Sequence, residues 1–258
     1  MTDMEKLITA ARSYCINNFR FWVGKYSQEN KSHRKLSDND YNLYSRFQII
    51  RVIQQEVETL VGLKFTPFEI CKQELVEMGK KSYSIGLTNR IAQNAMNEER
   101  EKFIKFVNSR TTENVSEVEP LPYRRRLTSK EMLSVRKKLL ELWNFDGGYW
   151  NPLEDQSPKE TVFLMQDNLT DEDCAKIADY LISTSGKRLY EVTEDRIDHE
   201  MEFDSFDINL HEAIIADKTF EWVIYGSHEG TLAFGGTALV GFIKSLFADR
   251  QDKLNKWE

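Results

Sequence analysis

The sequence predicts an α+β protein, in which an N-terminal all-α helical region is followed by an antiparallel sheet packed with helices. Through the first 110 residues, apolar side chains recur at a period close to 3.6, as in helices that bury one face. After residue 128 the patterns run helix, strand, helix, four strands and helix, an order typical of the α+β class. We therefore expect a helical bundle over 1–110, a linker over 111–127 and an acidic α+β domain over 128–258.

The first region is predicted to contain about four helices. The first helix has a natural stop at Gly24, and the second is capped by Ser37 or Asp38 and stops at Gly62. A third opens with the stretch TPFE at 66–69, whose threonine, proline and glutamate suit a cap, a first helical position and a capping box. A fourth helical pattern continues to about residue 107.

The stretch TTENVSEVEPLPYRRRL, residues 111–127, is expected to be the linker. It contains two prolines, lacks apolar periodicity and is polar and charged. The charge balance changes here: residues 1–127 carry 21 Lys and Arg against 16 Asp and Glu, and residues 128–258 carry 14 against 26. The first half therefore carries a net positive charge and the second half a net negative charge.

The second half opens with an amphipathic helix, TSKEMLSVRKKLLELWNF, whose apolar positions include Leu133, Leu140 and Trp143. TVFLMQD has strand length, and LTDEDCAKIADYLIS reads as a helix capped at Thr170 with acids in its first turn. KRLYEVTE is a further strand, FEWVIYG and TLAF are expected to form a hairpin, and the last helix begins at about Thr237.

The cysteines and the N-terminus indicate a cytoplasmic location. Cys15, Cys71 and Cys174 lie far apart and in no paired spacing, so neither a disulfide framework nor a zinc site is predicted. The acidic N-terminus lacks the features of a signal peptide, and no apolar run is long enough to span a membrane. We expect no membrane association and no cofactor.

The most informative stretch is acidic. Residues 191–217 contain ten acids and one base, and at its centre carboxylates alternate with His199, Met201 and Phe203. In an extended strand this alternation places the carboxylates on one face. The candidate partner-binding residues are these alternating acids and the next one along the chain: Asp198, Glu200, Glu202, Asp204 and Asp207.

Three interpretations of this acidic strand are open. It could be a solvated edge strand that charge protects from aggregation. It could be covered from within the chain, by the basic half or by the arginines at 124–126. It could also attract a separate basic protein, because a negative patch accelerates association and selects the partner. Calcium is a lesser option, since the acids lack an EF-hand spacing.

The stretch YGSHEGTLAFGG offers an alternative, a hydrolase-like or metal-dependent enzyme with its site at Ser227, His228 and Glu229, helped by Tyr225 or Asp146. No HExxH, GxSxG or P-loop motif accompanies these residues, so no metal ligands are expected. Turn chemistry explains the stretch more simply, as strand, turn, strand and a helix cap at Thr237.

Nucleic-acid binding is not favoured. NFRFWVGKY and YNLYSRFQ interleave aromatic and basic residues, a pattern compatible with stacking on bases. Aromatics at helical spacing are nevertheless more often core residues, and an excess of five positive charges over 127 residues is modest for such a protein.

FEWVIYGSHEGTLAFGG, followed by an amphipathic helix and preceded by the acidic FDSFDINL, resembles small cytoplasmic bacterial domains of uncharacterised function. These include immunity-type proteins that neutralise the toxins of competing bacteria. The resemblance covers at most the last 130 residues and implies a non-enzymatic protein that binds and blocks a partner. The leading hypothesis is therefore a protein-binding module that captures a basic protein, such as a toxin, through its acidic surface.

Overall fold

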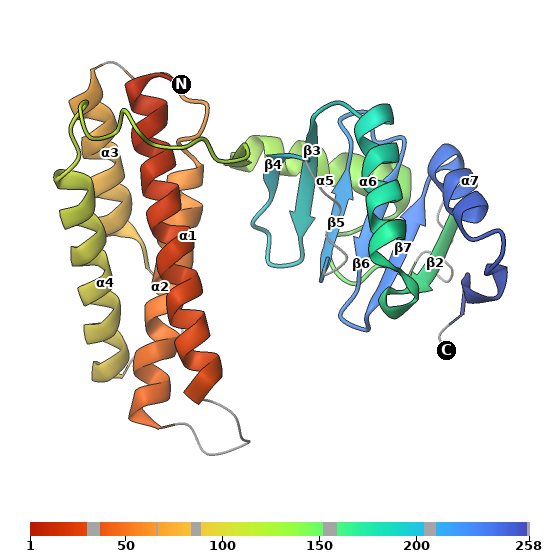
Figure 1. Cartoon of the computed structure of the whole chain (residues 1–258), viewed down its shortest axis with the longest axis horizontal. Coiled ribbons are helices and arrows are strands. Elements are labelled where there is room, and N and C mark those ends of the chain that lie inside the picture. The colour runs from red at the N-terminus through yellow and green to blue at the C-terminus, as the bar shows by residue number, and fades with distance from the viewer. Residues whose placement is uncertain (30–36, 66, 84–88, 152–158, 204–209, 257–258) are drawn as a thin grey trace. The chain divides into compact units, whose positions relative to one another are not determined.

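The computed structural model describes residues 1–29, 37–65, 67–83, 89–151, 159–203 and 210–256. It confirms the predicted α+β class, with helices in the N-terminal region and a seven-stranded antiparallel sheet after it (Figure 1). The chain divides into two compact units, Met1–Leu121 and Pro122–Glu258, which we call the helical unit and the sheet unit. Among the described residues, no helix has the length and apolar character needed to cross a membrane.

The described residues of the helical unit form the helices α1 (Asp3–Glu29), α2 (Asp38–Glu58), α3 (Phe68–Lys81) and α4 (Arg90–Asn108). Each contributes one apolar face to a shared core that includes Leu7, Ile53, Leu75 and Phe103. Side-chain caps begin two of them: Ser37 forms a capping box with Asp40 at α2, and Asn89 accepts a bond from the Ala92 amide at α4.

Two predicted helix signals in this unit were wrong. Gly24 does not end α1, which continues to Glu29; a Cβ added at Gly24 would meet nothing within 4 Å. At the third helix Pro67 is the N-cap and not the first helical residue as expected; the expected cap Thr66, and with it the capping box to Glu69, lies outside the described residues. A glycine on an open helix surface weakens a helix but need not stop it.

The stretch expected to be a linker belongs largely to the two units. Val115 is fully buried in the core of the helical unit, and Val118 packs against the same core. Further along, Arg124–Arg126 form β1, a strand of the sheet unit. Val115 and Val118 are only three residues apart, and β1 consists of arginines alone. Neither segment therefore shows the apolar periodicity by which a helix or strand is recognised in a sequence.

The sheet unit contains one antiparallel sheet in the order β1-β4-β3-β5-β6-β7-β2. Beyond β1 the strands are β2 (Thr161–Met165), β3 (Arg188–Thr193), β4 (His199–Glu202), β5 (Ala213–Ala216), β6 (Val223–Gly226) and β7 (Thr231–Gly235). Helices α6 (Asp171–Thr184) and α7 (Thr237–Leu246) pack on one face and α5 (Ser129–Trp143) on the other (Figure 1). Alternate residues of β6 serve the two cores: Ile224 faces α6 and α7, whereas Val223 and Tyr225 face α5.

Helix α5 buries only some of its apolar residues. Trp143 is buried with Val135 and Leu139, but Leu133 is 65% exposed and Leu140 48% exposed. The helix carries apolar residues on both faces, so its sequence does not determine which one meets the sheet.

The cap of α7 also differs from the prediction. Gly236 occupies the N-cap with φ of +111°, and Thr237 is the first residue of the helix. A Cβ at position 236 would lie 2.5 Å from the backbone oxygen of Glu221, so the turn needs a glycine for both space and conformation.

Candidate binding site on the acidic strand

Strand β4 has the predicted alternation. Met201 and Phe203 belong to the core under α6 and α7, while Glu200 faces the side of the sheet that α5 covers. Its location is not the predicted edge: β4 lies between β1 and β3, and β1 is the edge strand. The interpretation of β4 as a solvated edge was therefore wrong. The basic triplet at 124–126 supplies the neighbouring strand, as the second interpretation proposed.

Antiparallel pairing sets β1 against β4. Arg124 lies opposite Met201, Arg125 opposite Glu200 and Arg126 opposite His199. Side chains of directly opposed residues project from the same face of a sheet. Consecutive arginines therefore reach opposite faces, and each meets the side chains that β4 presents there.

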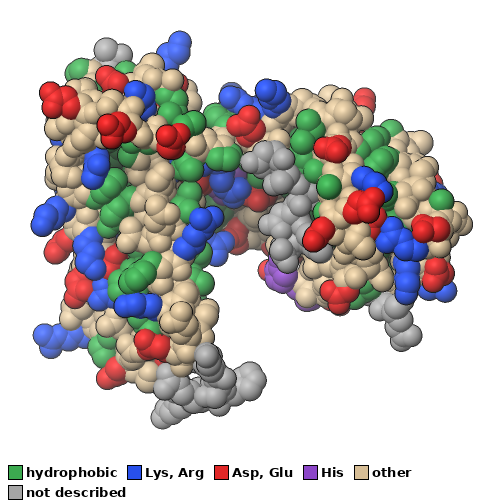
Figure 2. Space-filling model, in the orientation of Figure 1, with side chains coloured by type: hydrophobic (Ala, Val, Ile, Leu, Met, Phe, Trp, Pro, Cys, Tyr) green, Lys and Arg blue, Asp and Glu red, His purple; other side chains and the backbone are tan. Residues whose placement is uncertain are grey.

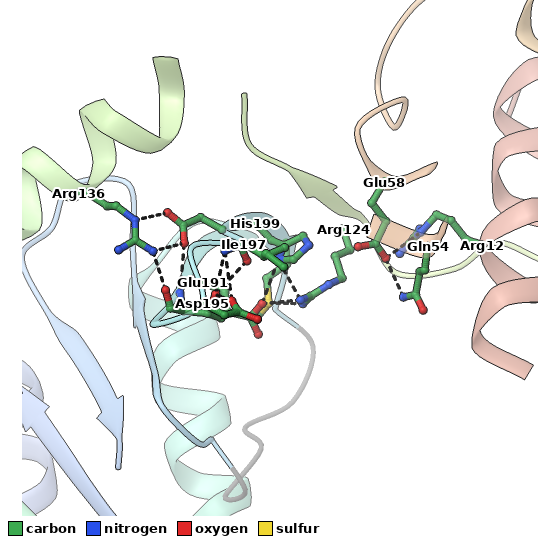
Figure 3. A network of polar contacts seen from close by, with 12 residues as sticks. Arg12, Gln54, Glu58, Arg124, Arg136, Glu191, Asp195, Ile197 and His199 are labelled. Carbon is green, nitrogen blue, oxygen red and sulfur yellow. Dashed lines mark hydrogen bonds and ion pairs between the residues drawn. The ribbon is translucent and has the colours of Figure 1, made fainter. Parts of the chain in front are cut away.

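Asp198, which immediately precedes β4, is an internal anchor. Its side chain has no exposed area, and Arg136 of α5 binds it with two hydrogen bonds, Nε to Oδ2 at 2.8 Å and Nη2 to Oδ1 at 2.7 Å (Figure 3). The backbone amide of Thr193 also donates to Oδ1. A paired, fully enclosed carboxylate of this kind holds α5 to the β3–β4 hairpin.

Glu200 is buried and is shared among several donors. Arg125 Nη2 donates to Oε2 at 3.1 Å, Lys218 Nζ to Oε1 at 2.5 Å and the hydroxyl of Tyr123 to Oε2 at 3.3 Å. Arg188 Nη1 lies 4.0 Å from Oε1. Burial alone raises the pKa of Glu200, but the hydrogen bonds from Lys218 and Arg125 outweigh it and leave the pKa below its ordinary value.

The other face of the strand pair carries a cluster of Arg124, Glu191 and His199 (Figure 3). Arg124 Nη2 lies 2.5 Å from Glu191 Oε2 and 3.0 Å from His199 Nδ1. Burial raises the pKa of Glu191, yet its bonds to His199 and Arg124 prevail and lower it to about 2. Glu191 is therefore ionised at neutral pH and matches the positive charge of β1.

Of the remaining predicted binding residues, the structure describes Glu202 alone. Glu202 is half-buried and accepts a bond from the Tyr123 amide at 3.3 Å, and Asp204 and Asp207 lie outside the described residues. On the face of the molecule shown in Figure 2, acidic and basic side chains are interspersed. Asp198 and Glu200, predicted to form an open binding surface, are instead buried and paired within the sheet unit.

The alternative site at Ser227 is a hairpin turn. Ser227 is 1% exposed, its Oγ lies 2.8 Å from Thr231 Oγ1, and it accepts a bond from the Glu229 amide. Gly230 has φ of +72°, as the turn requires. Among the described contacts, none joins the Ser227 hydroxyl to His228, so a nucleophile and base are not paired.

The side chains next to that hairpin also make contacts that stabilise the turn. The His228 ring lies 5.6 Å from that of Tyr149, whose hydroxyl donates to Glu229 at 3.1 Å. The buried hydroxyl of Tyr225 donates to Glu194 at 2.8 Å, and burial together with that bond raises the pKa of Tyr225.

Asp146, the other proposed helper, accepts a bond from the Gly148 amide within its own loop. In the part of the chain that the structure describes, no three or more His, Cys, Asp or Glu side chains gather in a way that could hold a metal ion.

The residues that the sequence did not point to are the hydrogen-bond donors around β4. Arg136 and Lys218 come from α5 and from the turn after β5, and Tyr123 precedes β1. Only the triplet at 124–126 carried a visible signal, since isolated basic residues on distant elements have no pattern. Comparison of the whole chain with family models, curated proteins and solved structures found no match.

Proposed function

We propose that the sheet unit is a non-enzymatic, cytoplasmic protein-binding module that captures a basic extended segment of a partner protein along β4, in the place that β1 occupies. The observation that supports the proposal most is the pairing of the all-arginine strand β1 with β4, in which Arg125 binds Glu200 of β4 and Arg124 binds Glu191 of the neighbouring β3. The acidic strand thus already has a basic strand as its ligand, one that the chain itself supplies. The partner would be a basic protein, such as the toxins implied by the resemblance to immunity-type proteins.

Strand β1 is short enough to be exchanged. It has three residues, none of them fully buried, and it stands at the edge of the sheet. Its flanking backbone bonds run from Leu127 N to Asp198 O at 2.8 Å and from Glu202 N to Tyr123 O at 2.7 Å. A partner strand with the same charges would form equivalent bonds, so the free energy of exchange is small although each strand binds well.

The side chains of β1 define the partner segment. Arg124 contacts Glu191 on one face, and Arg125 contacts Glu200 on the other. Tyr123 is placed against Glu200 and under the guanidinium of Arg188, which lies 3.7 Å from its ring centre. The matching sequence is an aromatic residue followed directly by two basic residues, because both faces of β4 then receive a cation.

Strand β1 also competes with the partner. A tethered segment has an effective local concentration in the millimolar range, so a free ligand binds only to the fraction of molecules in which β1 has left. The sheet unit is therefore expected to bind basic segments in general with low affinity, and a specific partner must add further contacts. Competition with β1 thus makes the binding selective.

The test uses a fluorescent peptide with the chain's own sequence PYRRRLT, residues 122–128, and a control peptide with glutamine at the three arginine positions. Peptide anisotropy is titrated with the parent protein and with the Arg124→Gln/Arg125→Gln variant, whose β1 is weakened. We expect at least tenfold tighter binding of the arginine peptide by the variant, since its β1 competes less. Adding Glu200→Gln to that variant should abolish the gain.

A matched control is Lys130→Gln/Lys137→Gln, which removes the same charge from exposed positions of α5 and should leave the affinity unchanged. Circular dichroism establishes that each variant is folded. Equal affinity of parent and variant, or equal binding of the two peptides, would show that β1 is a permanent strand and would overturn the proposal.

A further inference from the structure

A cavity of about 400 Å³ opens at the other end of the sheet unit, away from the Ser227 turn, where β3 begins and β5 ends. Its lining is formed by two short segments, Gly186–Lys187–Arg188 and Asp217–Lys218–Thr219. The volume lies in the range of small-molecule sites. Gly186 adds no side chain to it, and a Cβ there would meet nothing within 4 Å.

Three of the six lining residues are cations, Lys187, Arg188 and Lys218. The one acid of the lining, Asp217, is buried and already engaged: its Oδ2 accepts a bond from the Thr219 hydroxyl, and its Oδ1 accepts one from the Glu221 amide at 3.2 Å. Those bonds fix the turn after β5 and direct the acid's oxygens to that turn's own donors.

Within the described residues, the cations around the cavity outnumber the acids that pair with them. Lys218 and Arg188 both pair with Glu200, and Arg125 pairs with the same carboxylate. One negative charge is therefore shared by three positive charges. Arg125 has a second partner in Glu131, but within the described residues Lys187 forms no ion pair. A surplus of positive charge next to a concave surface attracts anions.

Arg188 is also preorganised. Its guanidinium lies over the ring of Tyr123, at 3.7 Å from the ring centre, and stacking of this kind restricts the side chain without using its N–H donors. A fixed guanidinium beside two lysines is an arrangement that suits the oxygens of a phosphate group.

We propose that this cavity, lined by Lys187, Arg188 and Lys218, is a binding site for a phosphate-type dianion, either inorganic phosphate or the phosphate group of a small phosphomonoester. A phosphate dianion neutralises more of the excess positive charge than a carboxylate, which has one negative charge. Its oxygens would accept hydrogen bonds from Lys187 and Arg188, and it would share Lys218 with Glu200. The site shares Tyr123 and Glu200 with the strand exchange proposed for β4, but phosphate binding does not require β1 to leave the sheet.

The test is a titration of the full chain with inorganic phosphate and, in a second arm, with adenosine monophosphate, each followed by ¹H–¹⁵N correlation spectra at constant ionic strength. We expect saturable shift changes at the amides of 186–188 and 217–219. Stronger binding of adenosine monophosphate would assign the site to phosphomonoesters, and equal or weaker binding would assign it to inorganic phosphate.

Lys187→Gln is the informative variant, because loss of a cation without an ion pair among the described residues should not unfold the sheet unit. Its dissociation constant for the tighter ligand is expected to rise about tenfold, as for the loss of one charged hydrogen bond. Lys176→Gln on α6, where the lysine pairs with Glu172 on the exposed surface, is the matched control and should keep the parent affinity.

Two results would overturn the site: no saturable change at 186–188 and 217–219 with either ligand, or an unchanged affinity in Lys187→Gln. Non-specific attraction is recognised by an equal loss in Lys187→Gln and Lys176→Gln, and it too would contradict the proposal. Neither result bears on the peptide titration of β4, so the two proposals fail separately.

Discussion

The helical unit and the sheet unit both bury charged side chains, but the scaffolds that hold the charges differ. In the helical unit, Arg46 of α2 donates to Glu99 of α4 at 2.6 Å, and both residues belong to helices of about twenty residues with large apolar faces. In the sheet unit, Glu191 and Glu200 face cations from a three-residue edge strand. The first kind of pair persists as long as the bundle is folded, whereas the second can be released by loss of one short strand.

The largest effect is expected where a buried carboxylate has a single strong cation. Arg136→Met should leave Asp198 enclosed without a counter-charge and lower the unfolding free energy of the sheet unit by about 3–5 kcal/mol. Urea denaturation followed by tryptophan fluorescence measures the loss. Lys137→Met on the exposed side of α5 is the control, with a change below about 0.5 kcal/mol. A small effect at Arg136 would mean that water reaches Asp198.

The next largest effect is on the stability of the sheet unit at low pH. Because the pKa of Glu191 is lowered to about 2, its ionised form stabilises the folded state fully at pH values above about 5, and the contribution of about 3 kcal/mol is lost as the pH falls toward 2. Glu191→Gln should therefore flatten the decline of stability between pH 5 and 2. Parallel stability curves for parent and variant would show that the cluster with Arg124 and His199 contributes nothing on balance.

A somewhat smaller loss, of about 2 kcal/mol, is expected for Arg46→Met in the helical unit, since Lys102 Nζ still donates to Glu99 at 2.8 Å. The double variant Arg46→Met/Glu99→Leu should recover most of it, because two apolar side chains replace a buried ion pair at little cost. If the double variant is less stable than the single one, the pair itself is a net source of stability.

The smallest expected change in stability tests most directly whether β1 can open while the rest of the sheet stays folded. Arg125→Gln should lower the equilibrium stability by only about 1 kcal/mol, because Glu200 keeps Lys218. Hydrogen exchange should nevertheless change at the β1–β4 contacts. We expect the amides of Leu127 and Glu202 to exchange at least tenfold faster than in the parent, with Val192 of β3 unchanged. Uniform acceleration across the sheet would show that β1 does not open separately.

Sequence patterns predicted the fold class and the alternation of β4, because both follow from local periodicity. They did not predict β5, whose four apolar residues are buried on both faces and so show no alternation. Nor did they predict β1, since three arginines carry no strand signal until an acidic strand is beside them. The burial of Asp198 depends on Arg136, 62 positions earlier in the chain, and no single-sequence pattern links the two.

The basic edge strand also determines where this protein can be divided. A cut at residue 128, where composition places the start of the acidic half, would remove β1 and leave β4 as a bare acidic edge with Glu191 and Glu200 deprived of their arginines. The unpaired backbone groups of such an edge are open to basic segments of other chains, although its own charge opposes pairing between copies. A gene fusion or a recombination event that transfers the sheet must therefore carry the codons of Pro122 to Leu127 with it.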